Sequence, residues 1–191
     1  ISVQVTGYCD PGKALTRKGS IEGDLVFVSG LIGEASRGLR ALQNDEDNTK
    51  EVSSYLRPRA RIDLGQRLIG IASSAIDVSD GLIKDLGHIC SESNLGCEIL
   101  IDDIPTSLTE PLTSGEINQG DDYEICFSAN GKYLSEIEGI AEVVQDTASQ
   151  SHCETAAVDN PPSPCRQCDD LYVFTWYHSS KLMIHRLCCW Q

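Results

Sequence analysis

A hydroxyl and two carboxylates lie close together in the segment 74–82, which reads SAIDVSDGL. Its apolar start predicts a strand, and its end predicts a helix capped by Ser79 or Asp80. Alternate residues of a strand share a face, so Asp77 and Ser79 point the same way and Asp80 follows in the first helical turn. Such oxygen ligands suit Mg²⁺, which usually takes one or two carboxylates together with phosphate oxygens and water. The alternative is structural: Asp80 only caps the helix, and Asp77 only ends a strand at the surface.

A second acidic group, GDDYE at residues 120–124, directly precedes the apolar run ICF. Adjacent carboxylates before a strand can bind a cation or accept hydrogen bonds from a ligand. Asp121 and Asp122 are therefore candidate binding residues, although isolated acidic pairs at such positions are more often solvated turns.

Basic residues gather in two short stretches. The segment 7–14, GYCDPGKA, nearly matches the phosphate-binding loop GxxxxGK[ST], but Ala14 has no hydroxyl for Mg²⁺ and Pro11 removes an amide donor. We reject a phosphate loop, and a candidate anion contact, or a solvated basic turn, remains at Lys13, Arg17 and Lys18. A second basic group, which either contacts phosphate or stays in solvent, surrounds Pro58 and comprises Arg57, Arg59 and Arg61.

Apolar periodicity predicts strands and helices in alternation, which is typical of the α/β class. We expect strands at 1–5, 24–30, 75–78, 97–101 and 123–127, and helices at 32–42, 64–72, 82–90 and 133–144. These elements predict a mixed sheet with helices packed against it. Because the chain begins inside an expected strand, we interpret it as a fragment or a processed piece.

Composition and charge exclude several classes of protein. A net charge of −14 argues against nucleic acid or an anionic membrane as the partner. No window approaches the roughly 20 apolar residues of a membrane-spanning helix, and residues 1–20 lack the apolar core of a signal peptide. We therefore expect a cytoplasmic protein, in which any anionic ligand is neutralised by a divalent cation.

The composition changes near residue 150. Residues 151–191 hold five of the nine cysteines, three of the four histidines and both tryptophans, whereas almost all of the net negative charge precedes them. The CxxC pair of Cys165 and Cys168 is typical of zinc sites, but a second CxxC or a regular histidine pair is missing. A zinc-binding tail stays an alternative to our preferred interpretation, in which the tail is not a native continuation of the domain.

Four segments, in order, resemble the thiamine-monophosphate kinase family, specifically its C-terminal domain of the aminoimidazole ribonucleotide synthetase-like type. They are VTG…PGKALTR at 5–17 with GDLVFVSG at 23–30, YLRP at 55–58, SAIDVSDGL…DLGH at 74–88, and GDDYEICF at 120–127. The resemblance implies that residues 1–145 are the kinase C-terminal domain. Residues 146–191 are then a divergent, Cys-rich tail, which we expect to be disordered or non-native.

By this resemblance the protein is an enzyme, a phosphotransferase that phosphorylates thiamine monophosphate to thiamine diphosphate with ATP and Mg²⁺. Asp77 and Asp80 would be Mg²⁺ ligands, Ser79 and Arg17 would contact ATP, and Asp121 would contact the substrate. No catalytic residue is assigned, because such an enzyme positions the reactants and neutralises charge without a covalent intermediate.

The chain also departs from the family. Nothing in it resembles the family's N-terminal domain, which supplies further aspartate ligands and most of the homodimer interface. Gln119 replaces a glycine of the family pattern, and Asp121 stands where the family has glutamate. We therefore expect the isolated chain to be inactive. Two alternatives stay open: another Mg-ATP-dependent synthetase of the same superfamily, and a non-catalytic nucleotide-binding module.

Overall fold

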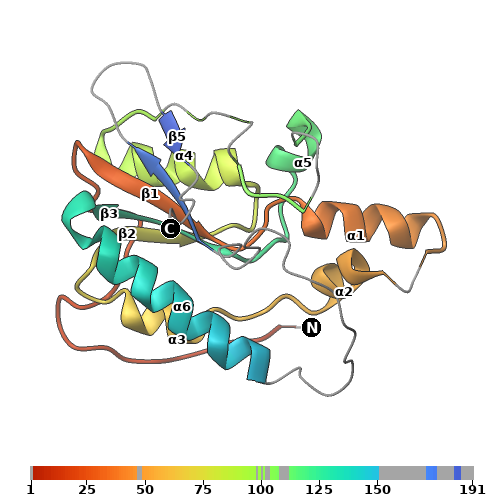
Figure 1. Ribbon diagram of the computed structural model, residues 1–191, viewed down its shortest axis with the longest axis horizontal. Coiled ribbons are helices and arrows are strands. Elements are labelled where there is room, and N and C mark those ends of the chain that lie inside the picture. The colour runs from red at the N-terminus through yellow and green to blue at the C-terminus, as the bar shows by residue number, and fades with distance from the viewer. Residues whose placement is uncertain are drawn as a thin grey trace, which may run out of the picture.

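The computed structural model describes residues 2–46, 49–97, 99, 101, 104–107, 112–150, 171–175 and 183–185. Its centre is a five-stranded sheet in the order β2-β3-β1-β4-β5 (Figure 1). The strands are β1 (Asp24–Ser29), β2 (Ala72–Asp77), β3 (Ile125–Asn130), β4 (Leu171–Thr175) and β5 (Met183–His185). The expected α/β class, with helices packed on a sheet, is confirmed.

The sheet differs from the expected mixed one, because every pair of strands among the described residues is antiparallel. β1 and β2 run in the same direction but are not neighbours. β3, which comes later in the chain, lies between them and pairs with both. The order of elements along the sequence does not reveal such an insertion.

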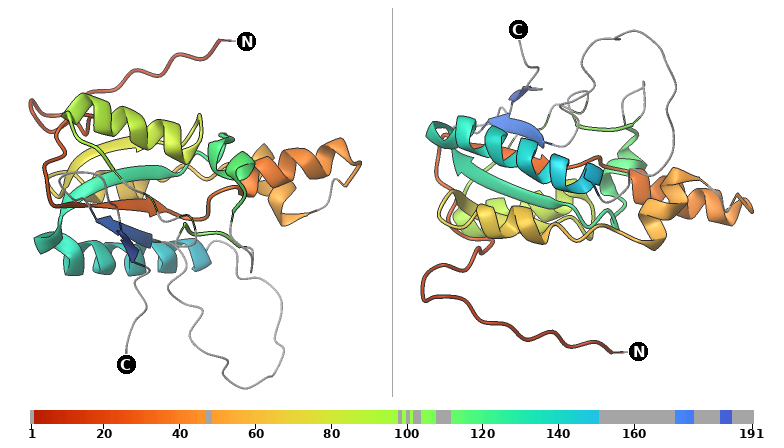
Figure 2. Two further views of the ribbon diagram at one scale, coloured as in Figure 1. Left: turned by 90° about the horizontal axis from the view of Figure 1, so that it is seen from above. Right: turned by 60° about the horizontal axis from the view of Figure 1, so that its bottom comes forward.

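Helices cover both faces of the sheet (Figure 2). They are α1 (Glu34–Gln43), α2 (Lys50–Leu56), α3 (Ile62–Arg67), α4 (Leu82–Ser93), α5 (Ser114–Asn118) and α6 (Leu134–Gln150), with a short 3₁₀ turn at Gly131–Tyr133. Helix α4 lies on one face, and α3 and α6 lie on the other. Helices α1 and α2 pack on each other beyond one end of the strands.

Alternating side chains of the central strands build two separate cores. On the α4 side, Val26 and Cys126 pack with Leu86 of the helix. On the other side, Phe27 and Phe127 are fully buried with apolar residues of α3 and α6. These two phenylalanines are register partners in β1 and β3, and their rings stack with centroids 5.0 Å apart. In β1 and β3 the period of two therefore directs alternate apolar residues to opposite cores.

Most expected elements are present, but the strand at 1–5 is wrong. Residues 2–9 form no strand, and Val3 and Val5 are 84% and 90% exposed. Alternation alone does not make a strand when no neighbouring strand pairs with it. Of the expected strand at 97–101, residues 97, 99 and 101 are not in a strand, and the other two lie outside the described residues.

The region beyond residue 145 is described only in part. Helix α6 continues to Gln150, and β4 pairs with β1. The candidate zinc ligands Cys165 and Cys168 lie outside the described residues. The domain boundary at 145 stays a prediction. Within the described residues, no helix has both the length and the apolar character that crossing a membrane requires.

Replacing Phe127 with alanine should lower the free energy of unfolding by about 3–5 kcal/mol, because it empties the centre of the α3–α6 core. Urea denaturation measures this change. Tyr8→Ala is the aromatic control, because Tyr8 is fully exposed at 104%. Equal stability of the two variants would contradict this arrangement of the core.

Candidate phosphate and metal site

Hydrogen bonds to the buried side chain of Asp85 fix the loop between β2 and α4. The buried carboxylate of Asp85 accepts hydrogen bonds from the backbone N–H groups of Ser79 and Asp80, each at 2.9 Å. Gly81, with a φ of 108°, occupies the cap position of α4. The expectation that Ser79 or Asp80 caps the helix is therefore wrong. Because Asp85 satisfies the loop amides, the side chains of Ser79 and Asp80 are not needed for capping.

Backbone hydrogen bonds join this loop to the acidic segment before β3. The N–H of Val78 donates a hydrogen bond to the C=O of Glu124 at 2.7 Å. The N–H of Tyr123 donates one to the C=O of Val78 at 2.9 Å. The N–H of Asp121 then donates to the C=O of Ser79 at 3.0 Å. These bonds continue the β2–β3 pairing past the end of both strands. The two acidic segments found in the sequence therefore form one site.

Two glycines allow the loops to approach so closely. A Cβ on Gly120 would lie 1.8 Å from the carbonyl oxygen of Ser79. A Cβ on Gly81 would lie 2.6 Å from the backbone of Asn118, the last residue of α5. Any side chain at either position would push the loops apart. We call the pairing of residues 78–81 with 118–124 the loop clasp.

Asp80 is exposed at the rim of the clasp and is held ionised. Its carboxylate accepts a hydrogen bond from the Nζ of Lys84, one turn along α4, at 2.5 Å. This hydrogen bond, the charge of Lys84 and, more weakly, the charges of His88 and Arg17 lower the pKa of Asp80. The expected metal ligand therefore carries its negative charge at neutral pH, and the expected ATP contact Arg17 acts on it electrostatically.

Asp121 belongs to the other of the two paired segments, residues 118–124. Both Asp121 and Tyr123 have left-handed backbones, with φ values of 71° and 51°. The hydroxyl of Tyr123 lies 3.4 Å from a carboxylate oxygen of Asp121, and the charges of Asp121 and, more weakly, Asp77 raise the pKa of Tyr123. Non-glycine residues in this region of φ are strained and are often found at functional sites. The expected substrate contact and the expected metal ligand Asp77 thus act on the same tyrosine.

The segment before β1 carries Arg17 along the outer edge of β2. The carbonyl of Thr16 accepts a hydrogen bond from the N–H of Ala75 at 2.9 Å. The segment is also anchored by a buried triangle of mutually hydrogen-bonded hydroxyls, 2.7 to 2.9 Å apart: Ser20, Ser74 and Ser128. Arg17 itself is exposed. The anchored segment therefore places the exposed guanidinium of Arg17 near the acidic loops.

Asp122 performs a structural task that the sequence did not reveal. Its two carboxylate oxygens accept hydrogen bonds from the N–H groups of Gly33 and Ala35, at 2.9 and 3.0 Å, and so cap the start of α1. Burial raises the pKa of Asp122 to about 6, although these two backbone hydrogen bonds act in the opposite direction. Of the two adjacent acids, Asp122 thus orients α1, whereas Asp121 contacts the hydroxyl of Tyr123.

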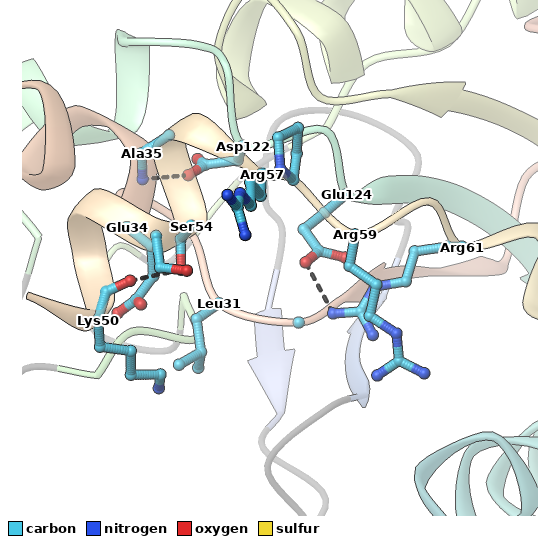
Figure 3. Close-up of a pocket in the computed structure, with 13 residues that line it drawn as sticks. Leu31, Glu34, Ala35, Lys50, Ser54, Arg57, Arg59, Arg61, Asp122 and Glu124 are labelled. Atoms are coloured by element: carbon cyan, nitrogen blue, oxygen red, sulfur yellow. Dashed lines mark hydrogen bonds and ion pairs between the residues drawn. The ribbon is translucent and has the colours of Figure 1, made fainter. Parts of the chain in front are cut away.

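A cavity of about 320 Å³ lies beside the clasp, between the start of α1 and the segment that follows α2. Figure 3 shows Glu34 and Lys50 at one end of it, and the Arg61–Glu124 pair at the other. Arg61 donates two hydrogen bonds of 2.7 Å to the Glu124 carboxylate. This nearly buried pair ties the acidic segment to the basic group around Pro58, in which Arg57 and Arg59 also line the cavity. That group is therefore partly structural.

The donors at the clasp fit a hard cation bound together with phosphate. Carboxylates of Asp77, Asp80 and Asp121 are the expected ligand type, and Mg²⁺ commonly takes only one or two of them. Over the described part of the chain, no group of three or more metal-binding side chains stands close enough to hold an ion by itself. An ion bound here would need phosphate oxygens and water as further ligands.

Comparison with known proteins decides the family. A family model described as "AIR synthase related protein, C-terminal domain" matches residues 22–161. The chain belongs to this family. Within it, the thiamine-monophosphate kinase of Salmonella typhimurium is 38% identical over 141 residues, which cover 67% of this chain and 43% of that protein. The enzyme of Haemophilus influenzae is 37% identical over 150 residues, covering 72% and 46%.

Solved structures of AIR synthase related proteins agree. The crystal structure of thiamine-monophosphate kinase from Stenotrophomonas maltophilia K279a has a TM-score of 0.64 and 36% identity, over 70% of this chain and 48% of that one. A structure described as "AaThiL complexed with AMPPCP and TMP" has a TM-score of 0.53 and 28% identity, over 62% and 43%. The resemblance to thiamine-monophosphate kinases is confirmed. The chain spans less than half the length of these relatives.

Replacing Gly120 with alanine should destabilise the protein by about 1–3 kcal/mol, because the added methyl group overlaps the Ser79 carbonyl. Gly87→Ala is the matched control. It lies within α4 with nothing within 4 Å of its Cβ, so it should stabilise by about 0.5–1 kcal/mol. Urea unfolding of both variants measures the difference. If Gly120→Ala is no less stable than Gly87→Ala, the clasp is not closed as described.

The contribution of Asp122 to stability should fall as the pH rises from the usual aspartate pKa of 3.8 to about 6. In this window folded Asp122 keeps a proton that the unfolded chain has lost, so each rise in pH favours unfolding. The loss amounts to at most about 3 kcal/mol, since one pKa unit corresponds to about 1.4 kcal/mol. Urea unfolding at several pH values, compared with Asp122→Asn, measures it. Parallel pH profiles for the two proteins would exclude this role.

Proposed function

We propose that this chain is the C-terminal half of a Mg²⁺-dependent kinase that transfers the γ-phosphoryl group of ATP to thiamine monophosphate. The observation that carries the proposal is the loop clasp, which brings the acidic segments around Asp80 and Asp121 together beside Arg17. Phosphoryl transfer needs mainly positioning and charge neutralisation, and this cluster offers both. The relative described with AMPPCP, an ATP analogue, and with TMP supports the same pair of ligands.

The side chains in the loop clasp, and those of Asp77 and Arg17 beside it, would each have a distinct role in this reaction. Mg²⁺, when held by Asp77 and Asp80, neutralises phosphate charge that the two carboxylates would otherwise repel. The hydroxyl of Ser79 can donate a hydrogen bond to a phosphate oxygen of ATP. Arg17 can stabilise the negative charge that develops on the transferred group, since it reaches the site from a fixed segment.

Asp121 is proposed as the contact to the acceptor. Thiamine monophosphate carries a positive thiazolium ring, which a carboxylate complements electrostatically. Asp121 is anchored through its own backbone N–H on the Ser79 carbonyl, so its position relative to the ATP-binding loop is fixed. The phosphate oxygen of the acceptor would then attack the γ-phosphorus in line, the bond from this phosphorus to the β,γ-bridging oxygen would break, and ADP would leave. No protein group forms a covalent bond.

We propose further that this chain does not catalyse the reaction alone. A kinase that binds two phosphate compounds needs more positive charge than the described clasp supplies, where Lys84 is already paired with Asp80. The remaining ligands would come from the part of the relatives that this chain does not cover. The homodimer, the cytoplasmic location and the absence of nucleic-acid and membrane partners that we expected belong to this proposal.

The chain should bind ATP only in the presence of Mg²⁺, and isothermal titration calorimetry measures this. Asp77→Ala and Asp80→Ala should each weaken binding by about 10-fold or more, as loss of groups at a metal site commonly does. Asp63→Ala, which removes an exposed aspartate from α3, should leave the affinity unchanged. ATP binding that is independent of Mg²⁺, or equal in all three variants, would contradict the site.

Turnover is tested separately, with thiamine monophosphate as acceptor. No thiamine diphosphate should form with the purified chain alone. Product formation by the chain would refute its proposed inactivity while supporting the kinase assignment. Mg-ATP binding without thiamine diphosphate formation, even after addition of an N-terminal half from a relative, would favour another synthetase or a non-catalytic nucleotide-binding module.

A further inference from the structure

Two cysteines meet at the end of α4 that lies away from the clasp. Cys90 belongs to the last turn of the helix, Cys97 follows it, and their Sγ atoms are 3.3 Å apart. The turn between them is fixed. Asn94 ends the helix with a left-handed backbone, and the N–H of Leu95 donates to the C=O of Cys90 at 2.9 Å. Leu95 also packs against the apolar core, so the chain is held reversed with Cys97 beside the helix.

The two thiols have different environments. Cys97 is exposed, whereas Cys90 is buried. Cys90 donates its S–H to Cys97, which lowers the pKa of Cys97 and raises the pKa of Cys90. The thiolate is the attacking species in thiol–disulfide exchange, so the exposed cysteine is the more reactive. Cys126, on β3, is fully buried, and burial raises the pKa of its thiol.

We propose that Cys90 and Cys97 form a redox-sensitive pair, which closes to an intramolecular disulfide when it meets a small disulfide such as oxidised glutathione. The Cys97 thiolate attacks one sulfur of the oxidant, which forms a mixed disulfide and releases one small thiolate. That thiolate takes the proton of Cys90. The Cys90 thiolate then attacks the Cys97 sulfur and releases the second small thiolate, which takes from water the proton that Cys97 lost when it ionised. The protein pair is oxidised, and the oxidant is reduced to two thiols.

The required movement is small, because the sulfurs need to approach from 3.3 Å to a bond length of about 2 Å. The disulfide would close over the helix end that Asn94 and Leu95 already order. It would crosslink the C-terminal end of α4. Asp85 lies in the first turn of this helix, and Asp80 lies in the loop before it. The pair is therefore a modification site of the fold and does not depend on the proposed kinase function.

The test exposes the reduced 191-residue protein to rising ratios of oxidised to reduced glutathione. Free thiols are blocked with N-ethylmaleimide under acid quench, and the protein is cleaved after glutamate. Glu92 lies between the two cysteines, so their crosslink appears as two peptides that separate only on reduction. Mass spectrometry should find this crosslink at a lower ratio than any modification of the exposed Cys9, with Cys126 still reduced.

Variants separate the two steps. Cys90→Ser should lose the crosslink and leave Cys97 in a lasting mixed disulfide with glutathione. Cys97→Ser should lose both products, and Cys9→Ser should lose neither. The proposal is overturned if the parent chain accumulates the mixed disulfide without closing it, if Cys9 reacts first, or if Cys97 pairs with a cysteine other than Cys90.

Discussion

Three backbone hydrogen bonds beyond the ends of β2 and β3 hold the proposed site together. They join Val78 to Glu124 and Tyr123, and Ser79 to Asp121, in a space that Gly120 and Gly81 leave open. Because these are main-chain bonds continuing a sheet, they place the acidic side chains without using them. The site is therefore continuous with the central sheet, and the exposed carboxylates of Asp77 and Asp80 are not used to pair the loops.

The aspartates of the two loops divide into structural and chemical groups. Asp85 and Asp122 turn inward and satisfy backbone N–H groups, one in the β2–α4 loop and one at the start of α1. Asp77 and Asp80 stay exposed and carry the charge that a cation would bind. A cluster of like charges is tolerable here because part of it is buried in hydrogen bonds and part is paired with Lys84.

Local pattern predicted part of this arrangement. The strand–loop–helix order placed Asp77, Ser79 and Asp80 together, because their neighbourhood depends only on adjacent residues. The approach of Asp121 could not be derived from periodicity, because it depends on β3 lying next to β2. The cap of α4 was wrong because the buried Asp85, an ordinary charged residue in the sequence, takes over the loop amides. The strand expected at residues 1–5 was wrong for another reason, because alternation does not make a strand without a neighbouring strand that pairs with it.

One measurement tests the shared site most directly. Mn²⁺ can replace Mg²⁺ in the complex with ATP, and its unpaired electrons broaden the NMR signals of amides that lie near it. The account predicts that amide signals of residues 77–81 and 120–123 broaden together, while that of Ile137 in the opposite core stays sharp. Broadening of one segment without the other, or broadening centred on residues 57–61, would contradict a single site built by the loop clasp.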